Sequence, residues 1–239
     1  MKYVLFVVFS AIILNATEYF SKVEPYEKYN ISSEVSAKVV FINKDIEYKY
    51  IQDKIAILKL DTNDEKIELD NLEKSLVFQK ELVDIKEQNY KNKYKVKQLS
   101  IYDKNQEKLA WIESEKTLEN LKKDIRVKKN TISKKEFYVK DKYVDELFVS
   151  QGEYVKAGTH LYTLYDFSKS KLEVFVRAKE INDLEDKEIF VNDKKSEYKI
   201  YKITSVRDTQ RVSTYKVILA KKNQSTNINF GKVVKVEFR

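Results

Sequence analysis

The segment that most constrains the fold is a long run, residues 62–136, that lacks both glycine and proline and is dominated by glutamate and lysine. Within it, apolar residues recur every seven positions in two series: Leu69, Leu76, Val83 and Tyr90, then Trp111, Leu118, Ile125 and Ile132. Seven-residue apolar spacing on a charged background is typical of helices that pack as a coiled coil. The segment therefore predicts two long helices.

The break between the two series lies at residues 99–103. Asp103, followed three residues later by Gln106, resembles an N-cap with its capping-box partner, so we expect the second helix to begin there. Two helices of about 34 residues, each about 50 Å long, that are joined by a short turn must pack antiparallel. Because two helices alone cannot enclose a core, this hairpin must project from another domain or pack on a partner.

Residues 31–60 and 137–166, on either side of the hairpin, are rich in β-branched and aromatic residues, which favour strands. A weak internal repeat relates the two segments, in which Phe41-Ile42 matches Leu147-Phe148. We therefore expect the segments to pair into one small β domain that carries the hairpin as an insertion. Gly152 and Gly158 flank a short strand of the second segment, and each suits a tight turn with positive φ.

The sequence patterns at the two ends of the chain predict an export signal and a small β domain. Met1-Lys2 and the apolar run from Tyr3 to Leu14 resemble an export signal, with a cleavage site after Ala16. The run is shorter than the roughly 20 residues that span a bilayer, so we favour a cleaved signal peptide over an uncleaved anchor. Residues 17–30, which hold the only proline, read as an extended lead-in. Residues 171–239 alternate short strands with turn signals, which predicts a small barrel or sandwich.

The composition excludes several classes of active site. The chain has no cysteine, which excludes disulfide frameworks, thiol catalysis, iron–sulfur clusters and cysteine zinc sites. His160 is the only histidine and has no acid or base partner nearby in the sequence, so we interpret it as structural. Three glycines in 239 residues argue against glycine-rich phosphate loops. We predict a protein that is not an enzyme and binds no cofactor and no metal.

The net charge of +8 would suit nucleic acid or an anionic membrane surface. However, the excess comes mainly from lysine, whereas specific nucleic-acid readers use the forked guanidinium of arginine. The densest basic run, residues 122–135, supports at most non-specific and salt-sensitive binding, so we expect no nucleic-acid partner. A lipoyl or biotinyl carrier would need one modifiable lysine in an uninterrupted domain, and here the hairpin interrupts it.

The order of these parts resembles that of the membrane fusion proteins, the periplasmic adaptor subunits of tripartite efflux and type I secretion systems. The best segment is residues 149–161, where Gly152, Val155, Gly158 and Leu161 have the Gly-x-x-Val-x-x-Gly-x-x-Leu rhythm of the second lipoyl half. The resemblance implies an α+β multidomain fold, in which a split lipoyl-like (barrel-sandwich hybrid) β domain is interrupted by a long antiparallel α-helical coiled-coil hairpin and followed by a small β-barrel. The domains are then the signal peptide (1–16), the extended N-terminal segment (17–30), the first lipoyl-like half (31–61), the hairpin (62–136), the second lipoyl-like half (137–167) and the β-barrel (168–239).

The resemblance also implies a function. Such an adaptor is periplasmic, is associated with the inner membrane, and links an inner-membrane transporter of RND or ABC type to an outer-membrane channel of the TolC type. It self-associates into a ring and serves efflux or secretion across the Gram-negative envelope. The alternative is an exported, basic coiled-coil interaction protein of the cell envelope without a transport role.

The resemblance places the contact with the channel at the hairpin tip, at Lys95, Leu99, Ser100, Ile101, Tyr102 and Asp103. Many efflux adaptors carry an arginine there, a leucine four residues on, and a serine that opens the second helix. Here Lys95 and Leu99 hold the first two places, and we expect Asp103 to take the capping place. The apolar residues Leu99, Ile101 and Tyr102 either form an exposed contact surface or merely pack over the end of the hairpin.

Overall fold

A computed structural model describes residues 17–208, 211, 213–226 and 228–239, so the expected signal peptide lies outside the described residues. The described chain consists of two long helices and several sheets, which confirms the α+β class. It divides into two compact units. We call residues 30–141 and 145–163 the hairpin unit, and residues 17–29, 142–144 and 164–239 the C-terminal unit.

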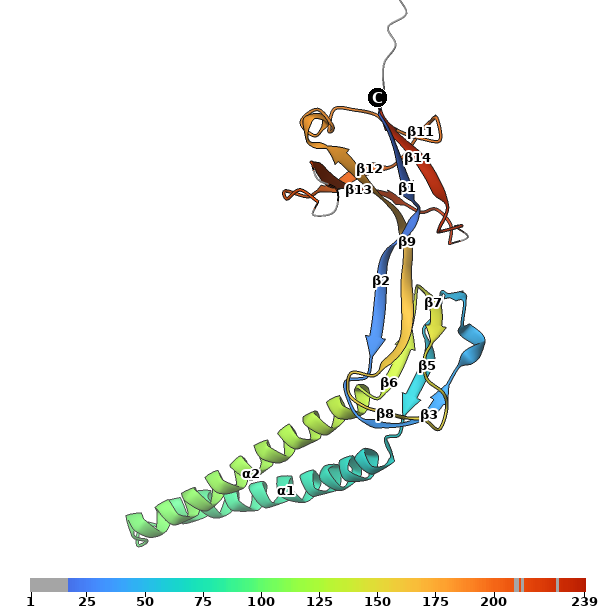
Figure 1. Ribbon diagram of the computed structural model, residues 1–239. Helices are drawn as coiled ribbons and strands as arrows, with labels where there is room; N and C mark the ends of the chain where they lie inside the picture. The colour runs from blue at the N-terminus through green and yellow to red at the C-terminus, as the bar shows by residue number, and fades with distance from the viewer. Residues whose placement is uncertain (1–16, 209–210, 212, 227) are drawn as a thin grey trace, which may run out of the picture. The chain divides into compact units, whose positions relative to one another are not determined.

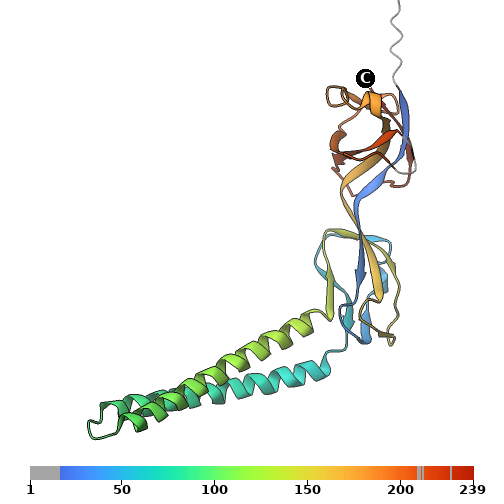
Figure 2. The same cartoon turned by 60° about the vertical axis from the view of Figure 1, so that its left-hand side comes forward.

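The hairpin unit carries both helices, α1 (Asn63–Lys95) and α2 (Ile101–Ser133), which lie side by side in both views (Figure 1 and Figure 2). Cross-helix contacts show that they run antiparallel. Glu73 near the start of α1 pairs with Lys129 near the end of α2 at 2.7 Å, whereas Lys93 at the end of α1 pairs with Glu107 at 2.5 Å. The short loop between the helices therefore forms one end of the hairpin.

The apolar residues at seven-residue spacing line the contact between the two helices. Val83, Leu118 and Ile125 are buried there, and the ring of Tyr90 stacks on Trp111 with a centroid separation of 5.7 Å. Gln79 adds one polar layer, because its Nε2 donates to the carbonyl oxygen of Ser114 at 2.9 Å. Each helix thus has one face that is covered by its partner in the same chain.

The β strands before and after the hairpin pair with each other. The four strands β3 (Ala37–Ile42), β5 (Ile55–Leu60), β6 (Glu136–Val139) and β8 (Tyr154–Val155) form one sheet in the order β6-β5-β3-β8. Their apolar side chains form a core that includes Val39, Ile57, Leu58, Leu60, Val139 and Val155. The two helices therefore leave and re-enter the same small sheet, through the adjacent strands β5 and β6.

Gly152 and Gly158 lie in the turns on either side of β8. Their φ angles are +90° and +88°, a conformation that side chains with a Cβ adopt only with strain. The backbone N–H of Gly152 donates to the carbonyl oxygen of Val39, and that of Gly158 donates to Ser33, each at 2.8 Å. The two glycines thus allow the second β segment to close on the first.

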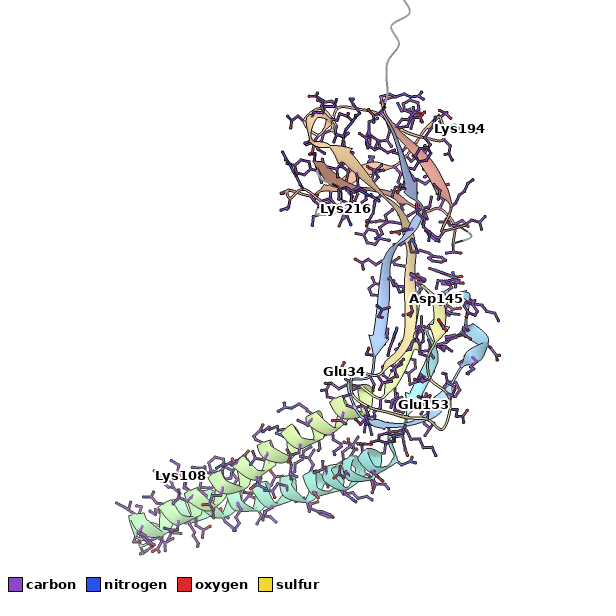
Figure 3. The ribbon with its side chains drawn as sticks, in the orientation of Figure 1. Glu34, Lys108, Asp145, Glu153, Lys194 and Lys216 are labelled. Atoms are coloured by element: carbon purple, nitrogen blue, oxygen red, sulfur yellow. The ribbon has the colours of Figure 1, made fainter. Side chains whose placement is uncertain are left out.

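A partly buried ion pair fixes the base of the hairpin. Lys135, just beyond α2, places its Nζ 2.6 Å from a carboxylate oxygen of Glu65 in α1 and 2.8 Å from the carbonyl oxygen of Asp61. Partial burial by itself would raise the pKa of Glu65, but the hydrogen bond and charge of Lys135 outweigh it and lower that pKa below its usual value. A second pair between Lys134 and Glu34, which is labelled in Figure 3, lies nearby with a separation of 2.7 Å.

We expect Lys135→Met to destabilise the hairpin unit by about 1–3 kcal/mol, because it leaves the Glu65 carboxylate and a backbone carbonyl without their charged donor. The loss should appear as a lower urea midpoint in far-ultraviolet circular dichroism. Since the pKa of Glu65 is depressed, its contribution is complete above about pH 4.3, the value in an unfolded chain, and disappears as pH falls through the lowered value. The double variant Lys135→Met/Glu65→Gln should recover part of the lost stability, because the uncompensated carboxylate is gone. If the single and the double variant are equally unstable, Lys135 does not stabilise the unit through Glu65.

The C-terminal unit contains two groups of paired strands. In the first, β1 (Glu18–Lys22), β14 (Val233–Phe238), β10 (Ile189–Val191) and β11 (Lys194–Lys195) are neighbours in that order. In the second, β12 (Lys199–Ile203) pairs with β13 (Thr214–Lys222), which in turn pairs with the long strand β9 (His160–Arg177). Leu172, Val174, Val217, Leu219 and Val236 are fully buried between them.

The remaining strands are β2 (Glu24–Ser32), β4 (Lys49–Ile51) and β7 (Lys142–Leu147). Three strands, β2, β7 and β9, contribute residues to both units.

Residues 17–30, which the sequence predicts to be an extended segment, contain β1 and most of β2. β1 pairs antiparallel with β14 from Glu18 opposite Glu237 to Lys22 opposite Val233, and Ser21 is buried. Tyr19 packs edge-to-face on Phe238, with ring centroids 5.8 Å apart, and its hydroxyl donates to Glu180. The N-terminal residues complete the fold of the C-terminal unit.

In the part of the chain that the structure describes, no helix has the combination of length and apolarity needed to cross a membrane.

Candidate partner-binding site at the hairpin tip

The hairpin tip, defined here as residues 94–104, is a tight connection between two regular helices. α1 ends at Lys95, and the backbone N–H of its C-cap residue Val96 donates to the carbonyl oxygen of Lys93 at 3.2 Å. Ser100 is the N-cap of α2. Only a few residues therefore separate the last turn of one helix from the first turn of the other.

The N-cap is Ser100 and not Asp103, so the expected start of the second helix was three residues late. The hydroxyl oxygen of Ser100 accepts from the backbone N–H of Asp103 at 3.1 Å, and it also donates to the carboxylate of Asp103 at 2.7 Å. A serine followed three residues later by an acidic residue is itself a capping signal, and serine binds the free backbone N–H groups of a first turn well. Asp103 instead places its negative charge in the first turn of α2, where the helix dipole favours it.

With Ser100 as the N-cap, Lys95, Leu99 and Ser100 follow the order of arginine, leucine and serine that the resemblance to efflux adaptors implies. The predicted tip residues all lie in the last turn of α1, the connection and the first turn of α2.

Apolar side chains point into solvent at the tip. Ile101 is 78% exposed and Tyr102 is 70% exposed, so neither packs over the end of the hairpin, whereas Leu99 is half-buried. Tyr94 and Val96, which the sequence analysis did not single out, are exposed beside them. Neither residue belongs to the seven-residue series that lines the helix contact. Apolar residues outside that series are expected to be exposed, so the sequence could have identified them as part of the tip surface.

Contacts between the two helices directly behind the tip fix the positions of the exposed apolar side chains. The ring of Tyr94 lies 5.8 Å from that of Tyr90, and the Lys104 ammonium lies 5.7 Å from the Tyr94 ring. The Lys93–Glu107 ion pair closes the last turn of α1 onto α2. The apolar surface is therefore presented by regular helix ends and not by a long loop.

The tip is also positively charged. Lysines recur at 91, 93, 95 and 97; Lys91 pairs with Glu87 at 2.8 Å, and Lys93 pairs with Glu107. Lys95 and Lys97 have no carboxylate partner among the described residues. The tip thus combines exposed apolar groups with uncompensated ammonium groups, which suits an apolar surface flanked by carboxylates.

Of the other residues singled out from the sequence, Gly152 and Gly158 lie in the turns beside β8, and His160 is the first residue of β9. The Nε2 of His160 lies 3.1 Å from the carbonyl oxygen of Tyr162, and its ring packs at a tilt against Phe148 with centroids 4.4 Å apart. Within the described ranges, no three acidic or histidine side chains are grouped as a metal site would require.

Comparison with protein-family models and with curated proteins gives no match. Solved structures do match. The membrane fusion protein Spr0693 of Streptococcus pneumoniae R6 superposes with a TM-score of 0.70 at 9% identity, over 93% of this chain and 98% of that one. A MacA–MexA chimera with the α-hairpin domain of Pseudomonas aeruginosa MexA gives 0.65 at 14% identity, over 93% of this chain and 80% of that one.

MacA from Actinobacillus actinomycetemcomitans gives a TM-score of 0.55 at 14% identity, over 94% of this chain and 78% of that one. At such identities the likeness concerns the fold alone. It nevertheless covers nearly all of the described residues, including the hairpin and the strands on both sides of it. The chain therefore has the fold of the membrane fusion proteins, and the resemblance seen in the sequence is confirmed at that level.

Proposed function

We propose that the protein is a non-enzymatic periplasmic adaptor, which links an inner-membrane transporter of RND or ABC type to an outer-membrane channel of the TolC type. In this proposal, residues 1–16 direct export, and the mature protein stays associated with the inner membrane. The paired β segments of the hairpin unit act as a lipoyl-like domain, the C-terminal unit acts as a small β-barrel, and copies assemble into a ring. The cargo is effluxed or secreted across the envelope.

The observation that carries the proposal is the hairpin with its exposed apolar tip. α1 and α2 each have 33 residues, and a helix of that length extends about 50 Å at 1.5 Å per residue. A soluble protein gains nothing by holding Ile101 and Tyr102 in water at the end of such an arm, so a covering partner is the simplest reason for them. The likeness to membrane fusion proteins supports an envelope partner for this tip.

Site-specific photo-cross-linking in the native cell tests the proposal. A photo-reactive residue replaces Tyr102 at the tip, a second variant places it at the exposed Lys187 of the C-terminal unit, and a control places it at the exposed Tyr154 in β8. We expect Tyr102 to capture an outer-membrane channel and Lys187 to capture an inner-membrane transporter. If neither position captures an envelope protein and the chain is cytoplasmic, the adaptor function is wrong.

A further inference from the structure

A hollow of about 580 Å³ lies in the C-terminal unit, and all of its lining residues belong to that unit. Its walls are the junction of β1 and β2, the middle of β9, one residue of β7 and the loop that precedes β14. Sites that bind small organic molecules usually have volumes of about 300–1,000 Å³ and mostly apolar walls with a few polar groups. The hollow therefore has the size of a small-molecule site.

A row of four aromatic rings lines the hollow. Tyr165 and Phe167 are two residues apart in β9, and Tyr143 lies in the neighbouring strand β7. The ring of Tyr143 stacks on that of Phe167, with centroids 4.7 Å apart, and lies 6.5 Å from that of Tyr165. Phe230 adds the fourth ring, 4.5 Å from that of Phe167. Aromatic rings attract one another at such separations, so the row favours a ligand that is itself flat and aromatic.

Backbone hydrogen bonds fix the loop that carries Phe230. The N–H of Gly231 donates to the carbonyl oxygen of Val23 at 2.8 Å, and the N–H of Val23 donates to the carbonyl oxygen of Lys232 at 2.9 Å. The stem of Lys22 runs beside this loop, because its Cε would lie 3.5 Å from a Cβ at position 231. The loop and the lysine thus form one wall of the hollow.

The charged groups that line the hollow have a net positive charge. They are three lysines and two glutamates, namely Lys22, Lys28, Lys171, Glu24 and Glu27. Lys171 pairs with Glu24 at 3.6 Å, so these two charges compensate each other. The carboxylate of Glu27 accepts a hydrogen bond from the hydroxyl of Tyr29. Both carboxylates therefore have a partner within the unit.

Lys22 and Lys28 differ from these groups, because neither has a carboxylate partner among the residues that the structure describes. Both are exposed, and the Nζ of Lys28 lies 5.7 Å from the centroid of the Tyr165 ring. The hollow thus combines an aromatic wall with two uncompensated ammonium groups. Such a site attracts a ligand with an apolar body and a negative charge, whereas both lysines would repel an organic cation that stacked on the rings.

We infer that this hollow binds a small organic anion with a flat aromatic body, such as an aromatic carboxylate or sulfonate. The aromatic body packs against Tyr165 and Phe230, and the anionic group meets the ammonium groups of Lys22 and Lys28. A neutral molecule of the same shape gains only the contact with the rings, so the anion should bind more tightly. The inference goes beyond the proposed function and does not depend on it, since binding requires neither a channel nor a transporter.

Fluorescence titration of the purified full chain with two matched dyes tests the inference. The anion 8-anilinonaphthalene-1-sulfonate and the neutral N-phenyl-1-naphthylamine have the same aromatic body, so their comparison isolates the effect of the negative charge. We expect one saturable site per chain, at which the sulfonate binds about tenfold more tightly because of its charge-assisted contacts with the two lysines. The preference should decrease as salt screens these charges. Equal affinities of the two dyes at low salt would overturn the inference.

The variant Lys22→Gln/Lys28→Gln should lower the affinity for the sulfonate to that for the neutral dye, and should leave the neutral dye unaffected. Both lysines are exposed, so the urea midpoint of the variant should match that of the natural chain. Lys179→Gln/Lys202→Gln is the matched control, since it removes the same charge from two exposed positions of the same unit that do not line the hollow. It should leave both affinities unchanged, and an equal loss in the two variants would reduce the preference to an effect of net charge and overturn the inference.

Phe230→Ala tests the aromatic wall, because it removes one ring of the row. It should weaken the binding of both dyes, and unchanged affinities would show that the dyes bind elsewhere and overturn the inference. Capture of a channel by the hairpin tip without dye binding at this hollow would leave the adaptor function standing and reject the site. Dye binding that depends on Lys22, Lys28 and Phe230, without capture by the tip, would do the reverse.

Discussion

Replacing Ile101 and Tyr102 with aspartate should abolish most of the binding of the hairpin tip to its partner. Buried apolar and aromatic anchors at the centre of an interface cost about 2 kcal/mol or more when they are removed, which corresponds to roughly a 30-fold loss in affinity for each. Aspartate at either position would also bury a charge in the apolar interface with the partner, which weakens binding further. The observable is the yield of channel captured by a photo-reactive residue at Lys97, in the same tip.

The substitution is suitable because it should leave the fold unchanged. Ile101 and Tyr102 are largely exposed and occupy the first turn of α2, where acidic residues are favoured by the helix dipole. We therefore expect the free energy of unfolding to change by less than about 0.5 kcal/mol. A thermal or urea melt of the variant separates loss of binding from loss of structure.

Tyr154→Asp serves as the matched control, since Tyr154 is 64% exposed in β8 of the same unit and is not part of the tip. It should leave the capture yield from Lys97 unchanged. An undiminished yield from the Ile101→Asp/Tyr102→Asp variant would show that the tip does not bind through its apolar groups.

The elements that the sequence predicts well are those specified by local patterns. The seven-residue spacing from Leu69 and from Trp111 identifies two helices because that spacing places side chains on one face whatever the rest of the chain does. Gly152 and Gly158 identify turns because their backbone conformation needs glycine. The Asn192-Asp193 turn between β10 and β11 is of the same kind, since both residues have positive φ, which these two residue types tolerate.

Non-local structure was harder to predict. β1 and β2 depend on strands far along the chain, because β1 pairs with β14 and β2 pairs with β9. Pro25 lies in the segment that the sequence predicts to be extended, and it is the second residue of β2, near the strand end where proline is tolerated. At the tip, Ser100 and Asp103 both offered capping signals, and the choice depended on how tightly the loop closes. Exposed apolar residues of the hairpin, such as Phe78 and Ile112, were hard to predict for another reason: their exposure becomes clear only once the covered face of each helix is known.

The strand β1 leads to the second large effect that we expect, which concerns Tyr19→Ala. The side chain of Tyr19 packs against the core of the C-terminal unit, contacts Phe238, and donates its hydroxyl to Glu180. Removing a large aromatic ring from such a site costs about 2–4 kcal/mol, somewhat less than for a fully buried ring. Amides of β13 and β14 should then exchange with deuterium much faster, in mass-spectrometric measurements on residues 17–239.

Phe20→Ala provides the control within the same strand, because Phe20 is 69% exposed and faces away from that core. It should change the stability by no more than about 0.5 kcal/mol and leave the exchange of β13 and β14 unaltered. Equal effects of the two substitutions would show that β1 acts only through its backbone pairing with β14. Removal of residues 17–22 should destabilise the C-terminal unit more than either substitution, since it deletes the pairing and the packing together.

A pH series on Tyr19→Phe isolates the hydroxyl. Burial, followed by the hydrogen bond to Glu180, raises the pKa of Tyr19 to about 12, whereas tyrosine in an unfolded chain titrates near pH 10. A group whose pKa is raised by folding contributes its stability below the unfolded value and loses it as pH rises through the folded value. The advantage of the natural chain over Tyr19→Phe should therefore be constant up to about pH 10 and disappear towards pH 12. An advantage that is unchanged over this range would mean that the hydroxyl does not donate to Glu180 in solution, and that β1 is held by its pairing and by the ring of Tyr19 alone.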